Sequence, residues 1–179
     1  QDFVSEDDPA ARNTTLEQML YKWAGVDDIS PASRGSYIDA RKLGVLEKFF
    51  GQAFVGTSGS SPTPTAAPLL NQSYQGIAEL MYAQLMAQTH LKSTYDSIIY
   101  TWDNKSQSLR GDASAAYAQL DSKYAVDPAG AISDAKEFLR TANSMRIIPS
   151  LDFGADIPDE FFDEADLLVG SAGTSVLVG

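Results

Sequence analysis

Apolar residues recur at helical spacing through most of this chain, and this periodicity restricts its fold more than any other feature. In "TTLEQMLYKWAGV", Leu16, Met19, Leu20 and Trp23 follow the spacing i, i+3, i+4, i+7, which places them on one face of a helix. We find no alternation of apolar and polar residues before Leu167, so no β-strand is predicted earlier in the chain. The pattern therefore favours an all-α fold.

Turn and capping residues set the expected limits of the first two helices. Thr14 and Glu17 have the spacing of a capping box, and Gly25 is suited to end the first helix. A second helix is predicted in "IDARKLGVLEKFFGQAF", with Asp39 as its N-cap. Its buried side is expected to comprise the apolar residues Leu43, Leu46, Phe49 and Phe50.

Longer helical stretches are predicted after the linker "GTSGSSPTPTAAP". Pro68 is placed to open a third stretch, which runs from Leu69 to about Trp102 with few helix breakers. It fits one bent helix or two abutting helices. The turn-forming residues of "DNKSQSLRGD" end it, and two further helices are expected with Asp112 and Asp127 as N-caps.

These signals predict an antiparallel bundle of about five to six helices. We expect a flexible N-terminus at residues 1–13, a helical domain at 14–146 with a linker at 56–68, and an irregular acidic tail at 147–179. The chain lacks an initiator methionine and a basic region followed by an apolar stretch, which suggests a piece of a larger protein without a Sec signal peptide here.

Charge and composition argue against several classes of function. The net charge of −11 suits nucleic-acid binding poorly, because that binding depends on lysine and arginine. No run of about 18 apolar residues predicts a transmembrane segment. The absence of cysteine excludes disulfides, thiolate zinc sites and cysteine nucleophiles. The lone histidine, His90, offers little to a catalytic triad or a two-histidine metal site.

The acidity is concentrated near the C-terminus. After Arg146 the sequence has carboxylates and no basic residue. Hard cations such as Ca²⁺ bind carboxylate oxygens, so Asp159, Asp163 and Asp166 are candidate calcium ligands. The alternative is a solvated acidic loop.

A second candidate for calcium lies between the first two predicted helices. Asp28, Ser30 and Asp39 stand at positions 1, 3 and 12 of an EF-hand-like loop, so Asp28 and Asp39 are possible ligands. Ser33, however, stands at the sixth position, where the loop needs glycine, and position 12 is aspartate instead of glutamate. In the alternative interpretation Asp39 caps the next helix and Arg34 forms a local ion pair.

The last residues, "DLLVGSAGTSVLVG", fit one degraded period of the calcium-binding β-roll repeat G-G-x-G-x-D-x-U-x. Ser171 replaces the second glycine and Ser175 replaces the aspartate that would bind calcium. A stacked solenoid needs roughly three repeats, so this tail is not expected to form a β-roll by itself.

The stretch "LEQMLYKWAGVDDISPASRGSYIDARKLGVLEKFFGQAF" resembles the haemolysin-type calcium-binding protein-related segment of large secreted bacterial RTX proteins, including the iron-regulated type. The similarity rests on Trp23-Ala24-Gly25, Ser33-Arg34-Gly35, Ile38-Asp39-Ala40-Arg41 and the run from Leu46 to Gly51. It continues in "LMAQTHLKSTYDSIIYTWD" and resumes weakly at 164–179. The resemblance implies a secreted, multi-module parent, exported by a type I system, with calcium repeats nearby. It supplies no catalytic residues.

The sequence therefore predicts a non-catalytic helical module of a large secreted, extracellular RTX-type protein, whether a toxin, an adhesin or the carrier of a separate enzyme. Its partners would be the neighbouring RTX repeats of the parent chain, which it would cap or space. The alternative is an adhesin-like binding module that recognises a protein or a cell surface. That alternative predicts a solvent-exposed apolar patch on the folded domain.

Overall fold

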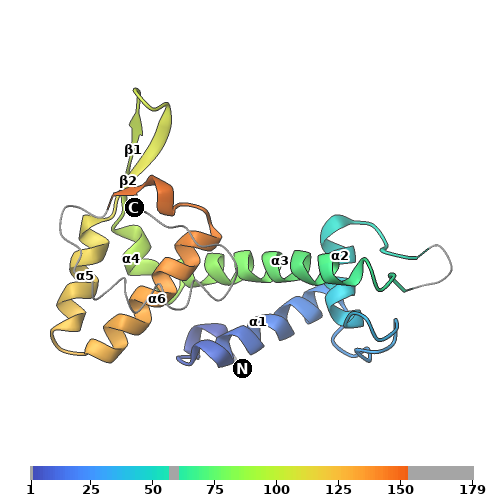
Figure 1. The fold of residues 1–179 in the computed structure, drawn as a ribbon. Coiled ribbons are helices and arrows are strands. Elements are labelled where there is room, and N and C mark those ends of the chain that lie inside the picture. Colours follow the sequence, from blue (N-terminus) through green and yellow to red (C-terminus); the bar gives the residue numbers. More distant parts are fainter. Residues whose placement is uncertain (1, 57–60, 153–179) are drawn as a thin grey trace. The chain divides into compact units, whose positions relative to one another are not determined.

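A computed structural model describes residues 2–56 and 61–152 of the chain, and this part is mostly helical (Figure 1). It contains six α-helices, two short 3₁₀-helices and three short strands. In chain order the elements are η1 (Phe3–Ser5), α1 (Pro9–Ala24), α2 (Ala40–Phe50), α3 (Ala67–Gln88), α4 (Lys92–Asp96), β1 (Ile99–Asp103), β2 (Ser108–Asp112), α5 (Ser114–Tyr124), α6 (Pro128–Ser144), η2 (Ile148–Ser150) and β3 (Leu151–Asp152).

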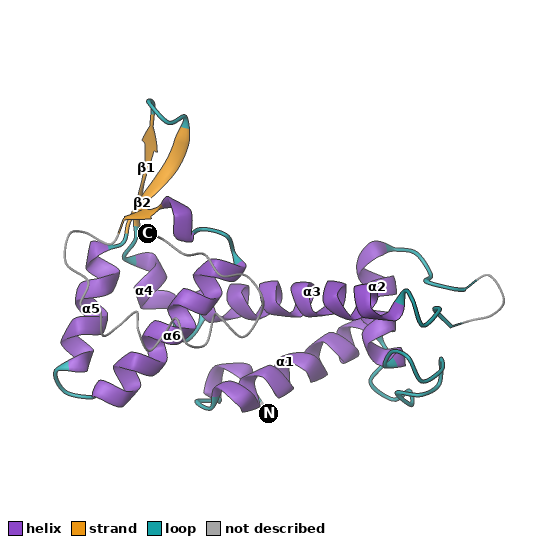
Figure 2. Ribbon diagram, viewed as in Figure 1, coloured by secondary structure: helices purple, strands orange, loops and turns teal. Residues whose placement is uncertain are grey.

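The three strands correct the expectation of an all-α fold, and Figure 2 shows them as a small sheet beside the helices. The chain divides into two compact units, Gln1–Tyr82 and Ala83–Gly179. No helix in the described residues combines the length and the apolar character that crossing a membrane requires.

Helix α1 begins earlier than the sequence predicts. The Asp8 side chain accepts a hydrogen bond from the Ala11 N–H at 2.8 Å, and Pro9 stands in the first turn. This N-cap and proline together favour a start at Pro9, so the expected capping box at Thr14 is wrong. The Thr14 hydroxyl instead donates to the Ala10 carbonyl at 3.1 Å. At the other end Gly25 has φ 72°, which confirms the predicted helix stop.

The first residues of the chain are packed against the first unit. Phe3 is 3% exposed, and its ring meets the ring of Tyr82 edge to face at 5.7 Å between centroids. Arg12, which is also buried, donates from Nε to the Tyr82 hydroxyl at 3.3 Å and from Nη1 to the Glu6 carbonyl at 3.4 Å. These contacts hold part of the segment that the sequence predicts to be flexible.

Helix α2 buries only part of its predicted apolar face. Leu43 and Leu46 are fully buried, and Leu43 belongs to a core cluster with Ile38 and Ala67. Phe49 and Phe50, however, are 45% and 52% exposed, so their predicted burial is wrong. They lie at the end of the helix, where Phe49 packs edge to face on Phe50, with ring centroids 5.2 Å apart.

The predicted helical stretch up to Trp102 ends early. The Thr89 hydroxyl donates to the Leu85 carbonyl at 2.6 Å just after α3, and the short helix α4 follows. Two abutting helices therefore describe this stretch better than one bent helix. The chain from Ile99 onward is a strand, because β-branched and aromatic residues favour extended backbone.

The strands form a sheet in the order β1-β2-β3 within the second unit. β1 and β2 pair antiparallel from Ile99 opposite Asp112 to Asp103 opposite Ser108, and β3 pairs parallel with the end of β2. Asp112 thus ends a strand, and Ala113 is the N-cap position of α5. The predicted N-cap role of Asp112 is wrong, although its carboxylate still accepts from the Ser114 N–H at 2.9 Å.

Helix α6 starts where the sequence predicts. Asp127 accepts from the Gly130 N–H at 3.0 Å, and Pro128 occupies the first turn, so this N-cap is confirmed. The buried face of α6 includes Phe138 and Thr141. The Tyr95 ring lies 5.0 Å from that of Phe138, and its hydroxyl is 2.6 Å from the Thr141 hydroxyl.

Candidate functional site

The candidate calcium ligands fall into two groups in the structure. Asp159, Asp163 and Asp166 lie outside the described residues. Asp28 is exposed in the turn after α1. Within residues 2–56 and 61–152, no three acidic or histidine side chains come together in a way that could hold a metal ion. Calcium binding therefore stays a prediction.

Asp39 has a defined structural role. Its Oδ1 accepts from the Arg41 N–H at 2.8 Å, as predicted for a helix N-cap, and its Oδ2 accepts from Arg41 Nη2 at 2.8 Å. Burial alone would raise the pKa of Asp39, but the hydrogen bonds and charge of Arg41 outweigh it and lower the pKa. The carboxylate is therefore held ionised against a guanidinium.

Arg34 and Glu47 join distant parts of the first unit. Arg34 Nη1 lies 2.6 Å from Glu47 Oε2, and its Nη2 donates to the Phe54 carbonyl at 3.1 Å. Glu47 Oε1 accepts from the Phe54 N–H at 2.8 Å. This arrangement, the Arg34–Glu47–Phe54 clasp, ties the turn before α2 and the segment after it to the helix itself. Arg34 thus forms an ion pair, but its partner lies 13 residues away on α2, so the prediction of a local partner is wrong.

Charged and aromatic side chains from α1, α2 and α3 meet in the same unit. The Arg41 guanidinium lies 4.6 Å from the centre of the Tyr21 ring, and Lys42 Nζ lies 5.1 Å from the centre of the Tyr74 ring. Glu17 is 3.3 Å from Lys42 Nζ and accepts from the Tyr74 hydroxyl at 3.5 Å. Burial, followed by the charge of Glu17, raises the pKa of Tyr74 to about 12. Burial also raises the pKa of Tyr21, so both tyrosines stay protonated at neutral pH.

A shallow pocket of about 280 Å³ borders this cluster. Its lining residues come from α1 and α3 and are Asn13, Thr14, Leu16, Glu17, Tyr74, Gln75, Ala78 and Glu79. Glu17 is already paired with Lys42 and Tyr74, and the Thr14 hydroxyl is bonded to its own helix. The Glu17 carboxylate and the Thr14 hydroxyl therefore serve contacts within and between the helices, so the pocket offers few polar groups to a ligand.

The second unit carries an exposed apolar surface, which we call the hairpin face. It consists of Tyr100, Trp102 and Leu109, which the strand register places on one side of the β1–β2 hairpin. Their exposed fractions are 43%, 57% and 50%. Figure 1 shows the hairpin extending beyond the ends of α4, α5 and α6. The paired strands of the hairpin thus keep adjacent aromatic and aliphatic side chains exposed to solvent.

The hairpin face depends on a glycine. A Cβ added at Gly111, which lies opposite Tyr100, would come within 2.8 Å of Leu151 Cδ2 and 3.0 Å of Tyr100 Cε1. The Tyr100 ring therefore packs where a side chain at position 111 would stand. This close approach anchors the base of the hairpin.

Replacing Gly111 by alanine is expected to destabilise the second unit by about 1–3 kcal/mol, because the new methyl group forces neighbouring side chains from their positions. Thermal unfolding followed by Trp102 fluorescence measures the loss, in a Trp23→Phe background. The control is Gly76→Ala on α3, where the new Cβ meets nothing within 4 Å. That change is expected to be neutral or stabilising, since alanine favours helix over glycine. Equal losses from both would contradict the packing role of Gly111.

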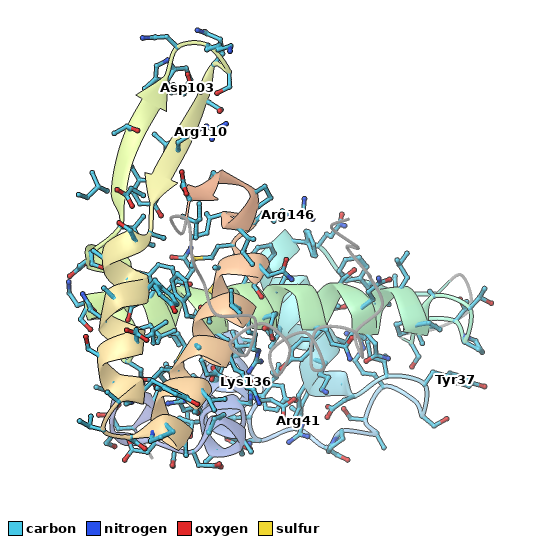
Figure 3. The ribbon with its side chains drawn as sticks, turned by 60° about the vertical axis from the view of Figure 1, so that its left-hand side comes forward. Tyr37, Arg41, Asp103, Arg110, Lys136 and Arg146 are labelled. Carbon is cyan, nitrogen blue, oxygen red and sulfur yellow. The ribbon has the colours of Figure 1, made fainter. Side chains whose placement is uncertain are left out.

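The tip of the hairpin is organised by Asp103. Its Oδ1 accepts from the Lys105 N–H at 2.8 Å, and its Oδ2 accepts from the Ser106 hydroxyl at 2.7 Å. Arg110 Nε lies 3.5 Å from the same Oδ2, and Figure 3 shows the two labelled residues on the two strands. The Ser106 hydroxyl bond, with the other hydrogen bonds and Arg110, lowers the pKa of Asp103.

The lowered pKa predicts that the hairpin loosens in acid. Because folding favours the ionised carboxylate, Asp103 stabilises the tip above the ordinary aspartate pKa of 3.8 and loses this effect as pH falls through the lower folded pKa. Amide chemical shifts of Ser106 and Gln107, followed in an NMR acid titration, are expected to move toward unfolded values. An Asp103→Asn variant should lack this titration step. An identical step in the variant would contradict the assignment to Asp103.

Sequence reasoning missed the hairpin face. Tyr95, Ile98 and Trp102 also follow helical spacing, which is why the predicted helical stretch extends to about Trp102. The available signal was the run "IIYTWD", which is rich in β-branched and aromatic residues and precedes a polar turn.

Comparison of the chain with protein-family models, with curated proteins and with solved structures gave no match.

Proposed function

We propose that this chain is a non-catalytic helical module of a large secreted protein, and that the hairpin face binds a protein partner. The observation that carries this proposal is the exposure of Tyr100, Trp102 and Leu109 side by side on one hairpin. Aromatic residues dominate the binding energy of many protein interfaces, because they combine a large apolar surface with few rotatable bonds. The helices, which the sequence predicts as an antiparallel bundle, act as the scaffold.

The charge of this region supports a protein partner. Between Ala83 and Asp152 the sequence has eight carboxylates and seven lysines or arginines, a difference of one charge. A nearly balanced charge gives little long-range attraction to nucleic acid, which needs an excess of basic groups. An apolar face in balanced surroundings instead favours contact with another protein surface.

The larger context of the proposal comes from the RTX-like stretch. In this proposal the parent protein is secreted, and the module caps or spaces calcium-binding repeats. The acidic residues Asp159, Asp163 and Asp166 are its proposed calcium ligands. Calorimetric titration of the chain with Ca²⁺ tests them: heat of binding should be lost when all three become asparagine and kept in Asp28→Asn. Loss only in Asp28→Asn would move the site to the turn after α1.

The hairpin face is tested by site-specific photocrosslinking in cells that produce the protein. A benzophenone amino acid replaces Trp102 in one variant and Tyr124, an exposed residue of α5, in the control. The proposal expects one defined protein adduct from position 102 and none from position 124. No adduct from position 102, or the same adducts from both positions, would contradict it.

A further inference from the structure

β1 forms an open edge of the sheet in the described part of the chain. The strand order β1-β2-β3 leaves one side of β1 without a paired strand among residues 2–56 and 61–152. In an antiparallel pair, every second residue of an edge strand directs its N–H and C=O groups away from the partner strand. β1 therefore offers backbone donors and acceptors to any extended chain that lies beside it.

This edge lacks three of the features that prevent pairing. Native edge strands are commonly protected by lysine, proline or a β-bulge. β1 contains none of these residues, and its five pairs with β2 continue without interruption from Ile99 to Asp103. The outer side of β2 is a poorer template, because β3 already pairs with it at Gly111 and Asp112.

The side chains along β1 restrict what can pair there. Tyr100 and Trp102 lie on one face of the strand, and Thr101 and Asp103 lie on the other. A strand added to this edge places its own alternate residues beside these two sets. Apolar residues suit the first face. Ile99 and, on β2, Arg110 share the second face, and Arg110 Nε lies 3.5 Å from the Asp103 carboxylate. This separation is longer than a close charge-assisted hydrogen bond, so the carboxylate can still accept from a basic residue of an added strand.

We infer that the open edge of β1 binds an extended segment of a partner protein by β-strand addition, and that this segment alternates apolar and basic residues. The inference rests on the proposed function, because it specifies how the partner engages the hairpin. Backbone hydrogen bonds to β1 hold the segment, and the contacts with Tyr100, Trp102 and Asp103 select its sequence.

The probe for this inference is an acetylated and amidated octapeptide in which valine and lysine alternate. It is titrated into the ¹⁵N-labelled full chain, and amide hydrogen exchange is measured with and without it. Strand addition is expected to slow exchange of the outward-directed amides in Ile99–Asp103 by about tenfold or more at saturation. The matched control peptide carries N-methyl groups on all of its residues, which removes the backbone donors from both of its edges, and should give no protection.

Side-chain selection is tested by placing a positive charge on the face of β1 that carries Thr101 and Asp103. Thr101→Lys is expected to lower the affinity of the chain for the valine–lysine peptide by about tenfold and to raise its affinity for a valine–glutamate peptide. Trp102→Ser is expected to lower the affinity for both peptides. Trp23→Ser is the matched control, since Trp23 on α1 is 51% exposed against 57% for Trp102, and it should leave both affinities unchanged.

Three results would overturn the inference, and they are separable from failure of the proposed function. Binding that requires Trp102 but leaves the β1 amides unprotected would mean contact through the hairpin face alone, so the proposed function would stand. Protection that rises with protein concentration in the absence of peptide would identify a second copy of the chain as the occupant. Absence of peptide binding would reject the strand-addition mode, while the crosslink from position 102 independently decides the proposed function.

Discussion

Replacing Tyr82 by alanine is expected to lower the free energy of unfolding of the first unit by about 3–5 kcal/mol. Tyr82 is fully buried, its ring packs edge to face on Phe3, and its hydroxyl accepts from Arg12 Nε. The truncation removes an aromatic ring from close-packed surroundings and leaves a cavity. It also leaves the buried Arg12 side chain without this acceptor.

Urea unfolding followed by tryptophan fluorescence measures this loss. The chain has two tryptophans, Trp23 on α1 and Trp102 on β1, so a Trp102→Phe background reports the first unit alone. The control is Tyr82→Phe, which keeps the ring and removes the hydrogen bond. It is expected to cost about 1 kcal/mol. A cost for Tyr82→Phe as large as that for alanine would show that the bond to Arg12, rather than the ring, carries the stability.

The second large effect is expected from Glu47→Ala, which removes the centre of the Arg34–Glu47–Phe54 clasp. The carboxylate is about a fifth exposed and accepts from both Arg34 and the Phe54 N–H. Hydrogen bonds to charged groups contribute about 1.5–3 kcal/mol each, and discounting for partial exposure gives an expected loss of about 2–3 kcal/mol. The same Trp23 fluorescence assay measures it.

The matched control for the clasp is Glu47→Gln. The amide oxygen can still accept from the Phe54 N–H, but the ion pair with Arg34 is lost. We expect it to cost roughly half as much as alanine. Equal losses of stability in the alanine and glutamine variants would assign the whole effect to the ion pair. A glutamine variant with unchanged stability would assign it to the hydrogen bond from the Phe54 N–H.

Local chemistry explains why parts of the fold could be predicted from the sequence. Asp39 caps α2, Gly25 ends α1, and Asp127 with Pro128 starts α6, as expected. Each of these signals acts over a few residues, because a capping aspartate bonds a backbone N–H in the adjacent turn and the left-handed conformation of Gly25 ends its own helix. Where two such signals compete, sequence alone is less decisive. Asp8 with Pro9 prevails over the capping box at Thr14.

Exposure is harder to predict, because it depends on what packs against a residue. Phe49 and Phe50 have helical spacing but remain half exposed at the end of α2. Trp102 follows the helical stripe of Tyr95 and Ile98, yet it stands on a strand in solvent. Periodicity identifies a candidate apolar face, but only the neighbouring elements determine whether that face is covered.

The sequence by itself therefore determined the helical character of this protein, the ends of several helices and the acidity of its C-terminus, since all three follow from residues close together in the chain. Only the tertiary structure decided the β1–β2 hairpin, the packing of Phe3 on Tyr82 and the Arg34–Glu47–Phe54 clasp. A strand needs a partner for its backbone hydrogen bonds, and a buried ring or ion pair needs groups brought from distant positions. The hairpin face, on which the proposed function rests, belongs to this second group.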